Sequence, residues 1–239
     1  LGSRGAVLKN PYCDDPHNYG ILRTSTEDLK FYAKEIANMG FQMNTHAIGD
    51  STVSVLLNEY KKVLHAIDDP RWRIEHSQVV DANEFELYND KILPSIQPTH
   101  ATSDMYWAYD RLGTRIKGAY AFKNLLKSSG KVALGTDFPV EKVNPFHTFY
   151  SSVERKDLKG YPENGFQMEN SLSREETLKG MTIWGAYFNF EEHEKGSLEI
   201  GKRADFVVIN QNIMEIEAEL IPKTEVVYTF VDGELVYSK

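Results

Sequence analysis

Two histidines and one aspartate stand where predicted strands end, and these residue types can bind a divalent cation. His46 closes the stretch "FQMNTH", His76 closes "RWRIEH", and Asp137 closes "KVALGTD". The separations are 30 residues (46 to 76) and 61 residues (76 to 137). Because one strand–helix unit occupies roughly 30 residues, the spacing predicts that these side chains recur at the same end of successive units.

Two imidazoles and a carboxylate are ligands that suit Zn²⁺ or a similar divalent ion. Such an ion lowers the pKa of bound water to about 7 and so supplies a nucleophile near neutral pH. An aspartate that touches both the ion and the water can take up the proton and pass it to a leaving group. The three residues therefore indicate a metal site that activates water.

Each of these residues also has a purely structural interpretation. A single histidine at a strand end more often forms structural hydrogen bonds, and Asp137 before Phe138-Pro139 suits an Asx turn. Asp50, four residues after His46, is interpreted as the cap of the next helix rather than as a ligand. Three metal-competent groups at corresponding strand ends favour the metal site over these alternatives.

The elements that must position these residues alternate between strands and helices. Apolar residues at helical spacing predict helices, and short apolar runs predict strands. In chain order we expect a loop at 1–24, a helix at 25–40, a buried strand at 41–46, a helix at 50–67, a strand at 72–76, a short helix at 81–90, a strand at 92–97 running into a loop at 98–100, a helix at 115–130, a strand at 131–136, and helices at 145–157 and 173–190. This alternation predicts an α/β fold with a parallel sheet.

The sequence pattern changes after residue 194, where two strand-like segments replace the alternation of strands and helices. Asp232-Gly233 separates "VVYTFV" from "ELVYS", and this dipeptide suits the positive φ of a tight hairpin turn. We therefore expect a boundary between a domain at 1–194 and a small β unit at 195–239.

Composition excludes several classes of partner. The chain has a net charge of −8 and a pI near 5.4, with no basic stripe, so we expect no nucleic acid partner. No apolar run reaches the ~20 residues that span a bilayer, so we expect no membrane segment. A single cysteine, Cys13, excludes an internal disulfide and a cysteine-based zinc cluster. A reducing, cytoplasmic location is the expectation from cysteine usage, although a targeting segment upstream of Leu1 would change it.

Six motifs together resemble those of the amidohydrolase superfamily, in particular its YtcJ-like branch, which includes N-substituted formamide deformylases. In chain order they are "LGSRGA", "THAIGD", "IEHSQ", "QPTH", "GTDFPV" and "GSLEIGKRADFVVI". The resemblance implies a (β/α)₈ TIM-type barrel with a small β-domain, one or two divalent ions with zinc expected, and hydrolysis of carbon–nitrogen bonds in small amide-type substrates.

The same resemblance implies a role for individual residues. His46 and His76 match metal ligands after strands five and six, and Asp137 matches the aspartate after strand eight, which is both ligand and general base. Metal-bound hydroxide would attack the carbonyl carbon, and Asp137 would carry the proton to the departing nitrogen. Gln97 and His100, at the end of strand seven, are expected to contact substrate.

The superfamily's first ligand pair, His-x-His, is absent, since no two of the seven histidines are two positions apart. The chain also opens inside the motif that follows the family's metal-bridging lysine. We therefore expect the C-terminal portion of a longer enzyme: a partial barrel of strands five to eight plus part of a composite β-domain, inactive by itself. An exposed sheet edge in such a fragment would permit self-association.

The sequence also permits two alternative functions. The chain would be a non-catalytic, ligand-binding or partner-binding half-barrel if it binds no ion. It would be a metal-free barrel enzyme, with Asp137 and a histidine as acid and base, if its activity survives a chelator.

Overall fold

The computed structural model describes all residues from 1 to 239, and the chain divides into two compact units. Unit 1 comprises Leu1–Ile96 and Ser103–Val132, and unit 2 comprises Gln97–Thr102 and Ala133–Lys239. The elements up to residue 132 are α1 (Thr26–Asn38), β1 (Asn44–Ala47), α2 (Asp50–Val63), β2 (Trp72–His76), the 3₁₀ helix η1 (Phe85–Leu87), β3 (Ile92–Ile96), α3 (Pro98–Leu112), the 3₁₀ helix η2 (Gly113–Gly118) and α4 (Phe122–Ser129). Those after residue 132 are β4 (Ala133–Leu134), α5 (Pro145–Glu154), η3 (Met168–Asn170), α6 (Arg174–Met181), α7 (Ile183–Phe188), β5 (Phe206–Ile209), η4 (Ala218–Lys223), β6 (Val226–Val231) and β7 (Glu234–Ser238).

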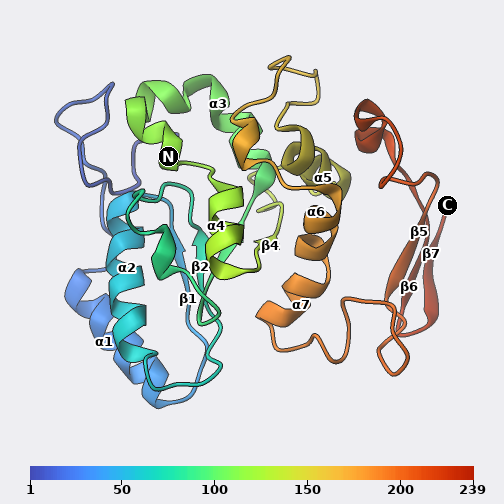
Figure 1. Ribbon diagram of the computed structural model, residues 1–239, viewed down its shortest axis with the longest axis horizontal. Helices are drawn as coiled ribbons and strands as arrows, with labels where there is room; N and C mark the ends of the chain where they lie inside the picture. The colour runs from blue at the N-terminus through green and yellow to red at the C-terminus, as the bar shows by residue number, and fades with distance from the viewer. The chain divides into compact units, whose positions relative to one another are not determined.

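Unit 1 is built on three parallel strands in the order β1, β2, β3. α1 and α2 lie against each other beside this sheet, as Figure 1 shows. The parallel pairing confirms the α/β fold expected from the alternation of strands and helices. Because parallel strands share one direction, the residues that follow β1 and β2 emerge at the same edge of the sheet.

α2 covers the sheet with the apolar stripe that its sequence predicts. Its inward residues include Val53, Leu57 and Tyr60, each with no exposed surface. The Tyr60 ring meets the buried Trp72 ring of β2 edge to face, with centroids 4.8 Å apart. Burial of each such side chain contributes about 1.5–3 kcal/mol, so the stripe holds the helix on the strands that carry the histidines.

The boundaries of α1 follow its sequence signals. The Ser25 hydroxyl accepts a hydrogen bond from the Asp28 amide at 3.0 Å and caps the helix. Gly40, at φ +73°, follows the helix and turns the chain toward β1. Only glycine takes this left-handed conformation at low cost, which explains why the helix ends here.

The strand predicted at 41–46 is shorter, later and less buried than expected. β1 covers Asn44–Ala47, and both Asn44 and His46 are exposed. β1 pairs with β2 alone within its sheet. An edge strand lacks a neighbour on one side, so part of its surface stays open to solvent.

The loop predicted at 98–100 and the helix predicted at 115–130 both differ from the structure. Residues 98–100, expected in a loop, begin the 15-residue helix α3, in which Pro98 takes the first helical position. Proline suits that position because its missing N–H would be unpaired there in any case. The helix expected at 115–130 is interrupted, because η2 ends at Gly118, Tyr120 takes φ +52°, and α4 begins at Phe122.

Unit 2 has its own apolar core around α5 and η4. Phe149 and Ile221 are fully buried there, with Phe146, Tyr150 and Ile213 nearly so. The capping box predicted at the start of α6 is present, with the Ser173 hydroxyl accepting from the Glu176 amide. The helix expected at 173–190 breaks at Thr182, where φ is −129° and ψ is −97°, and so becomes α6 and α7.

The strand expected at 131–136 contracts to the two residues of β4. Asp137, three residues after β4, has a φ of +58°, which is incompatible with a strand. Asp137 begins a turn, in which its carbonyl accepts a hydrogen bond from the Val140 amide at 2.8 Å.

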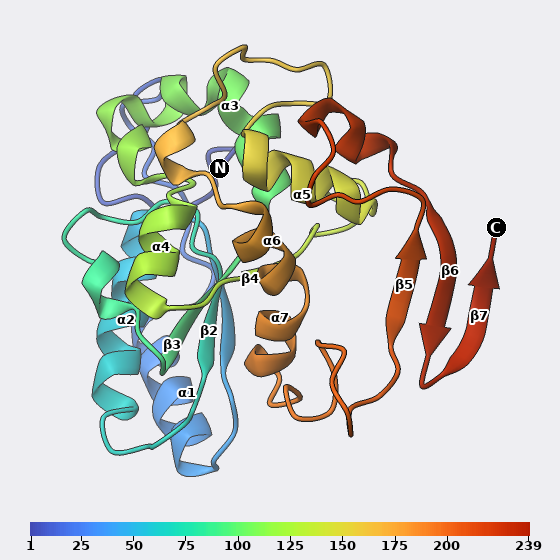
Figure 2. The same cartoon turned by 45° about the vertical axis from the view of Figure 1, so that its right-hand side comes forward.

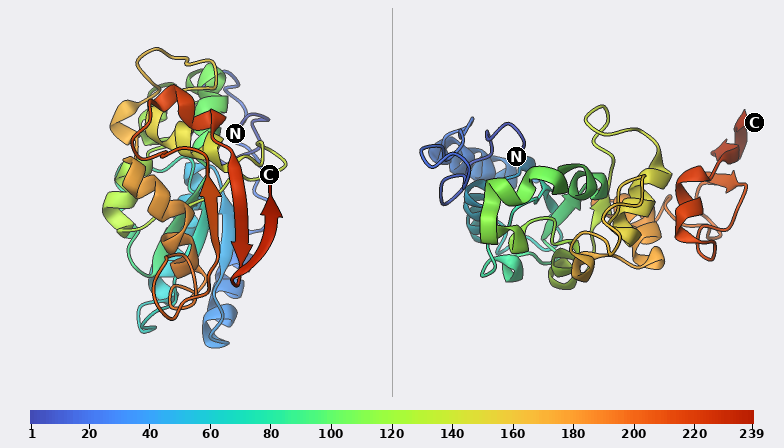
Figure 3. Two further views of the ribbon diagram at one scale, coloured as in Figure 1. Left: turned by 90° about the vertical axis from the view of Figure 1, so that its right-hand side faces the viewer. Right: turned by 90° about the horizontal axis from the view of Figure 1, so that it is seen from above.

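The C-terminal segment forms the antiparallel sheet β5, β6, β7, as Figure 2 shows. Asp232 and Gly233, at φ +52° and +81°, make the predicted hairpin turn, and the hairpin is the red end of the chain in Figure 3. Phe206 and Phe230 are register partners, and their rings stack with centroids 4.5 Å apart. None of the helices has the length and apolar character needed to cross a bilayer.

Candidate functional site

His46 and His76 are neighbours at the ends of adjacent strands in unit 1. β1 and β2 are in register so that Ala47 lies opposite His76. The two imidazole rings are 4.5 Å apart between centroids and meet at 73°. His76 is buried, with 9% of its surface exposed, and His46 is exposed. The structure therefore brings together the two histidines that the spacing singled out.

The backbone that presents His76 is held in an uncommon conformation. His76 has φ +74° and Ser77 has φ +45°, and a non-glycine residue in such a region costs on the order of 1–3 kcal/mol. The surroundings oppose this cost: the Ser77 hydroxyl donates to the Ile74 carbonyl at 3.0 Å and accepts from the Tyr88 hydroxyl at 2.8 Å. Burial raises the pKa of Tyr88 above its ordinary value, so it remains a donor.

In unit 2, Asp137 lies against His100. The Asp137 Oδ2 atom is 3.2 Å from Nε2 of His100, and Glu141 Oε1 is 3.1 Å from the other ring nitrogen, Nδ1. The exposed fractions of the side chains are 10% for His100, 37% for Asp137 and 19% for Glu141. The carboxylate of Asp137 is thus directed at an imidazole by the turn that follows β4.

His100 is placed between two carboxylates, which restricts what its ring can do. A neutral imidazole donates from one nitrogen only, whereas an imidazolium donates from both. Through these two contacts His100 restricts the orientation of Asp137, and its expected contact with substrate stays a prediction.

Glu141 is a residue that sequence analysis did not single out. It lies in the segment between β4 and α5, where no periodic pattern marks it. Its position four residues after Asp137 is the only signal, and a spacing of four has meaning in a helix but not in this turn.

Gln97 is buried, with 8% of its surface exposed, directly before α3. Its carbonyl accepts a hydrogen bond from the His100 amide at 3.1 Å. Gln97 therefore helps to set the first turn that carries His100, and its expected contact with substrate stays a prediction.

The Gly49-Asp50 pair after β1 has a structural role. Gly49 is the N-cap residue of α2, and Asp50, expected to be the cap, is instead the first helical residue. The Asp50 carboxylate accepts a hydrogen bond from the Lys9 amide at 2.9 Å. Burial raises the pKa of this carboxyl, with the Lys9 amide acting in the opposite direction. Asp50 thus ties the N-terminal loop to α2, and its predicted role as the helix cap is wrong.

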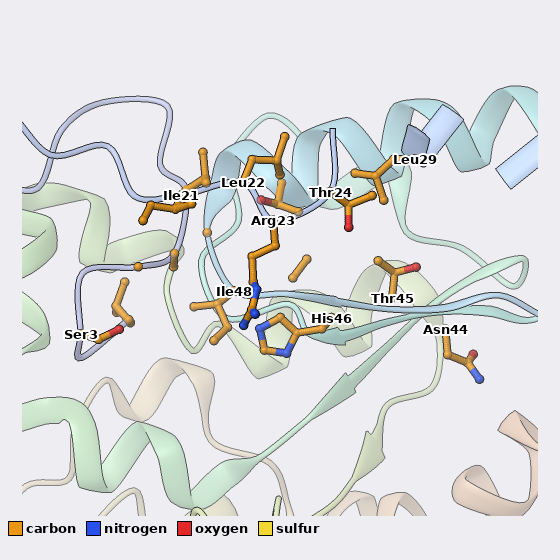
Figure 4. A pocket seen from close by; sticks show the side chains of 17 residues that line it. Ser3, Ile21, Leu22, Arg23, Thr24, Leu29, Asn44, Thr45, His46 and Ile48 are labelled. Atoms are coloured by element: carbon orange, nitrogen blue, oxygen red, sulfur yellow. The ribbon is translucent and has the colours of Figure 1, made fainter. Parts of the chain in front are cut away.

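A cavity of about 620 Å³ opens beside His46, entirely within unit 1. Figure 4 shows His46 on its wall together with side chains from the N-terminal loop and from β1. Its lining residues are Leu1, Ser3, Gly5, Ala6, Val7, Ile21, Leu22, Arg23, Thr24, Leu29, Asn44, Thr45, His46, Ala47, Ile48, Gly49 and Thr52. A volume of this size accommodates a small organic molecule.

The donor set fits a divalent cation. Unit 1 offers two neighbouring imidazoles, and unit 2 offers a partly exposed carboxylate oriented by an imidazole. Nitrogen and oxygen donors of this kind suit Zn²⁺. The histidine pair belongs to unit 1, and the carboxylate with its imidazole belongs to unit 2.

The sequence matches the family model Amidohydro_3, described as "Amidohydrolase family", over residues 1–237. It is 33% identical to the protein LONG AFTER FAR-RED 3 of Arabidopsis thaliana, over 99% of this chain and 41% of that protein. It is 32% identical to the putative amidohydrolase YtcJ of Bacillus subtilis, over 100% of this chain and 45% of that protein. An N-substituted formamide deformylase of Arthrobacter pascens is 21% identical over 90% of this chain.

Among solved structures, an uncharacterized metal-dependent hydrolase from Pyrococcus horikoshii superposes with a TM-score of 0.78 at 27% identity. That match covers 91% of this chain and 44% of the other. A second metal-dependent hydrolase, from Pyrococcus furiosus, gives a TM-score of 0.73 at 30% identity. The chain therefore spans less than half the length of the curated relatives that it matches.

Proposed function

We propose, from the premise that this chain belongs to the amidohydrolase family, that it supplies catalytic residues of a metal-dependent hydrolase for carbon–nitrogen bonds. The family match and the likeness to YtcJ and to the formamide deformylase confirm the branch indicated by the motifs. The activity is proposed for the protein that contains this chain, because the relatives are more than twice as long.

His46, His76 and Asp137 are the proposed metal ligands, with zinc as the ion. The observation that carries this assignment is the pair of imidazole rings 4.5 Å apart at the ends of two adjacent parallel strands. His76, His100 and Asp137 are also residue types able to hold an ion, so His100 is an alternative ligand to His46. When bound, a divalent cation supplies Lewis-acid chemistry, polarising a carbonyl and lowering the pKa of water.

Asp137 is the proposed general base. Its side chain is 37% exposed, so water and substrate can reach the carboxylate. It would take a proton from water and deliver it to the departing nitrogen, the step that makes amine expulsion feasible. His100 would hold the carboxylate through the 3.2 Å contact with Oδ2 and be held in turn by Glu141.

The proposed architecture is a partial (β/α)₈ barrel in which β1 to β4 correspond to strands five to eight. Its support is the parallel order of β1, β2 and β3 and the TM-score of 0.78 with a metal-dependent hydrolase. The domain boundary between residues 194 and 195 belongs to the same proposal, with 195–239 as part of a small β-domain.

Metal analysis tests the site directly. The full chain is incubated with zinc and dialysed, and zinc is then counted per chain. We expect bound zinc in the wild type and its loss in His46→Ala, His76→Ala and Asp137→Asn. His193→Ala is the matched control, since the His193 side chain is 91% exposed. Wild-type chain without zinc at any concentration would support the non-catalytic, binding-only alternative.

Hydrolysis of an N-formyl amide is the second measurement. The substrate class follows from the formamide deformylase relative and is carried over only as a proposal. We expect activity of the protein that contains this chain to disappear in chelator and to return with zinc. Activity that persists in chelator would instead support the metal-free acid–base reading.

A further inference from the structure

Arg23 has a distinctive place in the cavity beside His46. Figure 4 shows its side chain extending from the segment before α1 into the cavity and toward the His46 ring. No hydrogen bond or ion pair within the chain engages its guanidinium, although most arginines here have a carboxylate or carbonyl partner. A guanidinium that is always charged and held in a cavity without a partner is available to a ligand.

The cavity wall contains no acidic side chain, although the chain has 35 Asp and Glu residues against 27 Lys and Arg. Arg23 is the one Lys, Arg, Asp or Glu side chain among the lining residues. Apolar walls come from Ile21, Leu22, Leu29 and Ile48. The cavity therefore combines a fixed positive charge with an apolar surface.

We propose that Arg23 binds the carboxylate of a ligand in this cavity, and that the ligand is an amide carrying both a carboxylate and a short apolar side chain, as an N-acyl amino acid does. The fork of the guanidinium matches a carboxylate with two parallel hydrogen bonds. The apolar walls receive the side chain, and about 620 Å³ is ample for a molecule of this size. Because Arg23 extends toward the His46 ring, the carboxylate would bind beside that ring and the rest of the ligand would lie along the apolar walls.

This inference rests on the proposed function, because the ligand is a substrate only if the protein is a hydrolase. Binding of the ligand can nevertheless be measured without catalysis. The probes are N-formylleucine, which carries the carboxylate, and N-formylleucinamide, a neutral analogue of nearly the same shape. Their dissociation constants are measured by calorimetry on the full chain, first free of metal and then loaded with zinc.

We expect the wild type to bind the carboxylate probe about 10-fold more tightly than the amide probe. This preference is at the lower end of what a hydrogen bond to a charged group provides, because Arg23 is exposed and solvent screens its charge. Arg23→Gln should bind both probes equally, because its affinity for the carboxylate probe falls while its affinity for the amide probe is unchanged. Arg23→Lys should keep part of the preference, since it retains the charge without the fork. The control is Arg203→Gln, which removes an arginine of unit 2 that does not line the cavity and lies 3.7 Å from Glu194. This variant should keep the full preference.

Equal binding of the two probes by the wild type, binding of neither, or a full preference in Arg23→Gln would each overturn the inference. Failure of the proposed function would look different. Zinc would then be absent from the wild type while the metal-free chain still preferred the carboxylate probe. Conversely, Arg23→Gln that keeps its zinc but loses the preference would support both.

Discussion

Replacement of Gly49 by alanine should destabilise the fold through a single backbone contact. A Cβ atom at Gly49 would lie 2.0 Å from the carbonyl oxygen of Val7 and 2.7 Å from its carbon. Cβ contacts under 3.0 Å are essentially never found, so the Val7 carbonyl would have to move by about 1 Å, the difference between 3.0 and 2.0 Å. Gly49 itself has φ −84°, so the need for glycine comes from this close approach and not from strain in its own backbone.

The expected cost combines two effects. Forcing extra volume into a packed site costs about 1–3 kcal/mol. The Val7 carbonyl also accepts from the Ser51 amide at 3.3 Å in the first turn of α2, and loss of this hydrogen bond adds about 0.5–1.5 kcal/mol. We therefore expect Gly49→Ala to lower the free energy of unfolding by about 2–4 kcal/mol.

Urea unfolding followed by circular dichroism measures this free energy. The matched control is Gly135→Ala, because an added Cβ at Gly135 meets no atom within 4 Å and its φ is not in the left-handed region. That variant should stay within about 0.5 kcal/mol of the wild type. If Gly49→Ala unfolds at the same urea concentration as Gly135→Ala, the argument from the Val7 contact is wrong.

Three further variants probe other contacts. Arg155 is fully buried and donates to the Phe166 carbonyl at 2.8 Å, so Arg155→Met should cost about 2–4 kcal/mol in urea unfolding by leaving the loop carbonyl without its donor. Ser173→Ala should cost about 1 kcal/mol by the same measurement, through loss of the cap of α6. Because burial raises the pKa of Asp50 above 3.8, the folded state holds its proton longer than the unfolded state, and ionisation lowers stability as pH rises from 3.8 through the raised pKa. Asp50→Asn should therefore gain stability relative to the wild type between pH 4 and pH 7, and a constant difference across that range would contradict the raised pKa.

Local signals in the sequence determined several elements correctly. The apolar stripe of α2, the Ser25 and Ser173 caps, β2 at residues 72–76 and the Asp232-Gly233 hairpin all depend on residues close together in the chain. Spacing along the chain also led to the His46–His76 pair, because parallel strands return to the same edge of a sheet at a regular interval. These features are local or periodic, and a single sequence is sufficient for them.

Tertiary structure decided the rest. α3 begins at Pro98 where the sequence suggested a loop, and Tyr120 takes a left-handed backbone inside a predicted helix. The contact of His100 with Asp137 and Glu141 joins residues 37 and 41 positions apart, and the cavity that receives Arg23 is formed by the N-terminal loop meeting β1. No periodic pattern encodes such contacts, because packing between distant segments selects the turn geometry and the side-chain directions that create them.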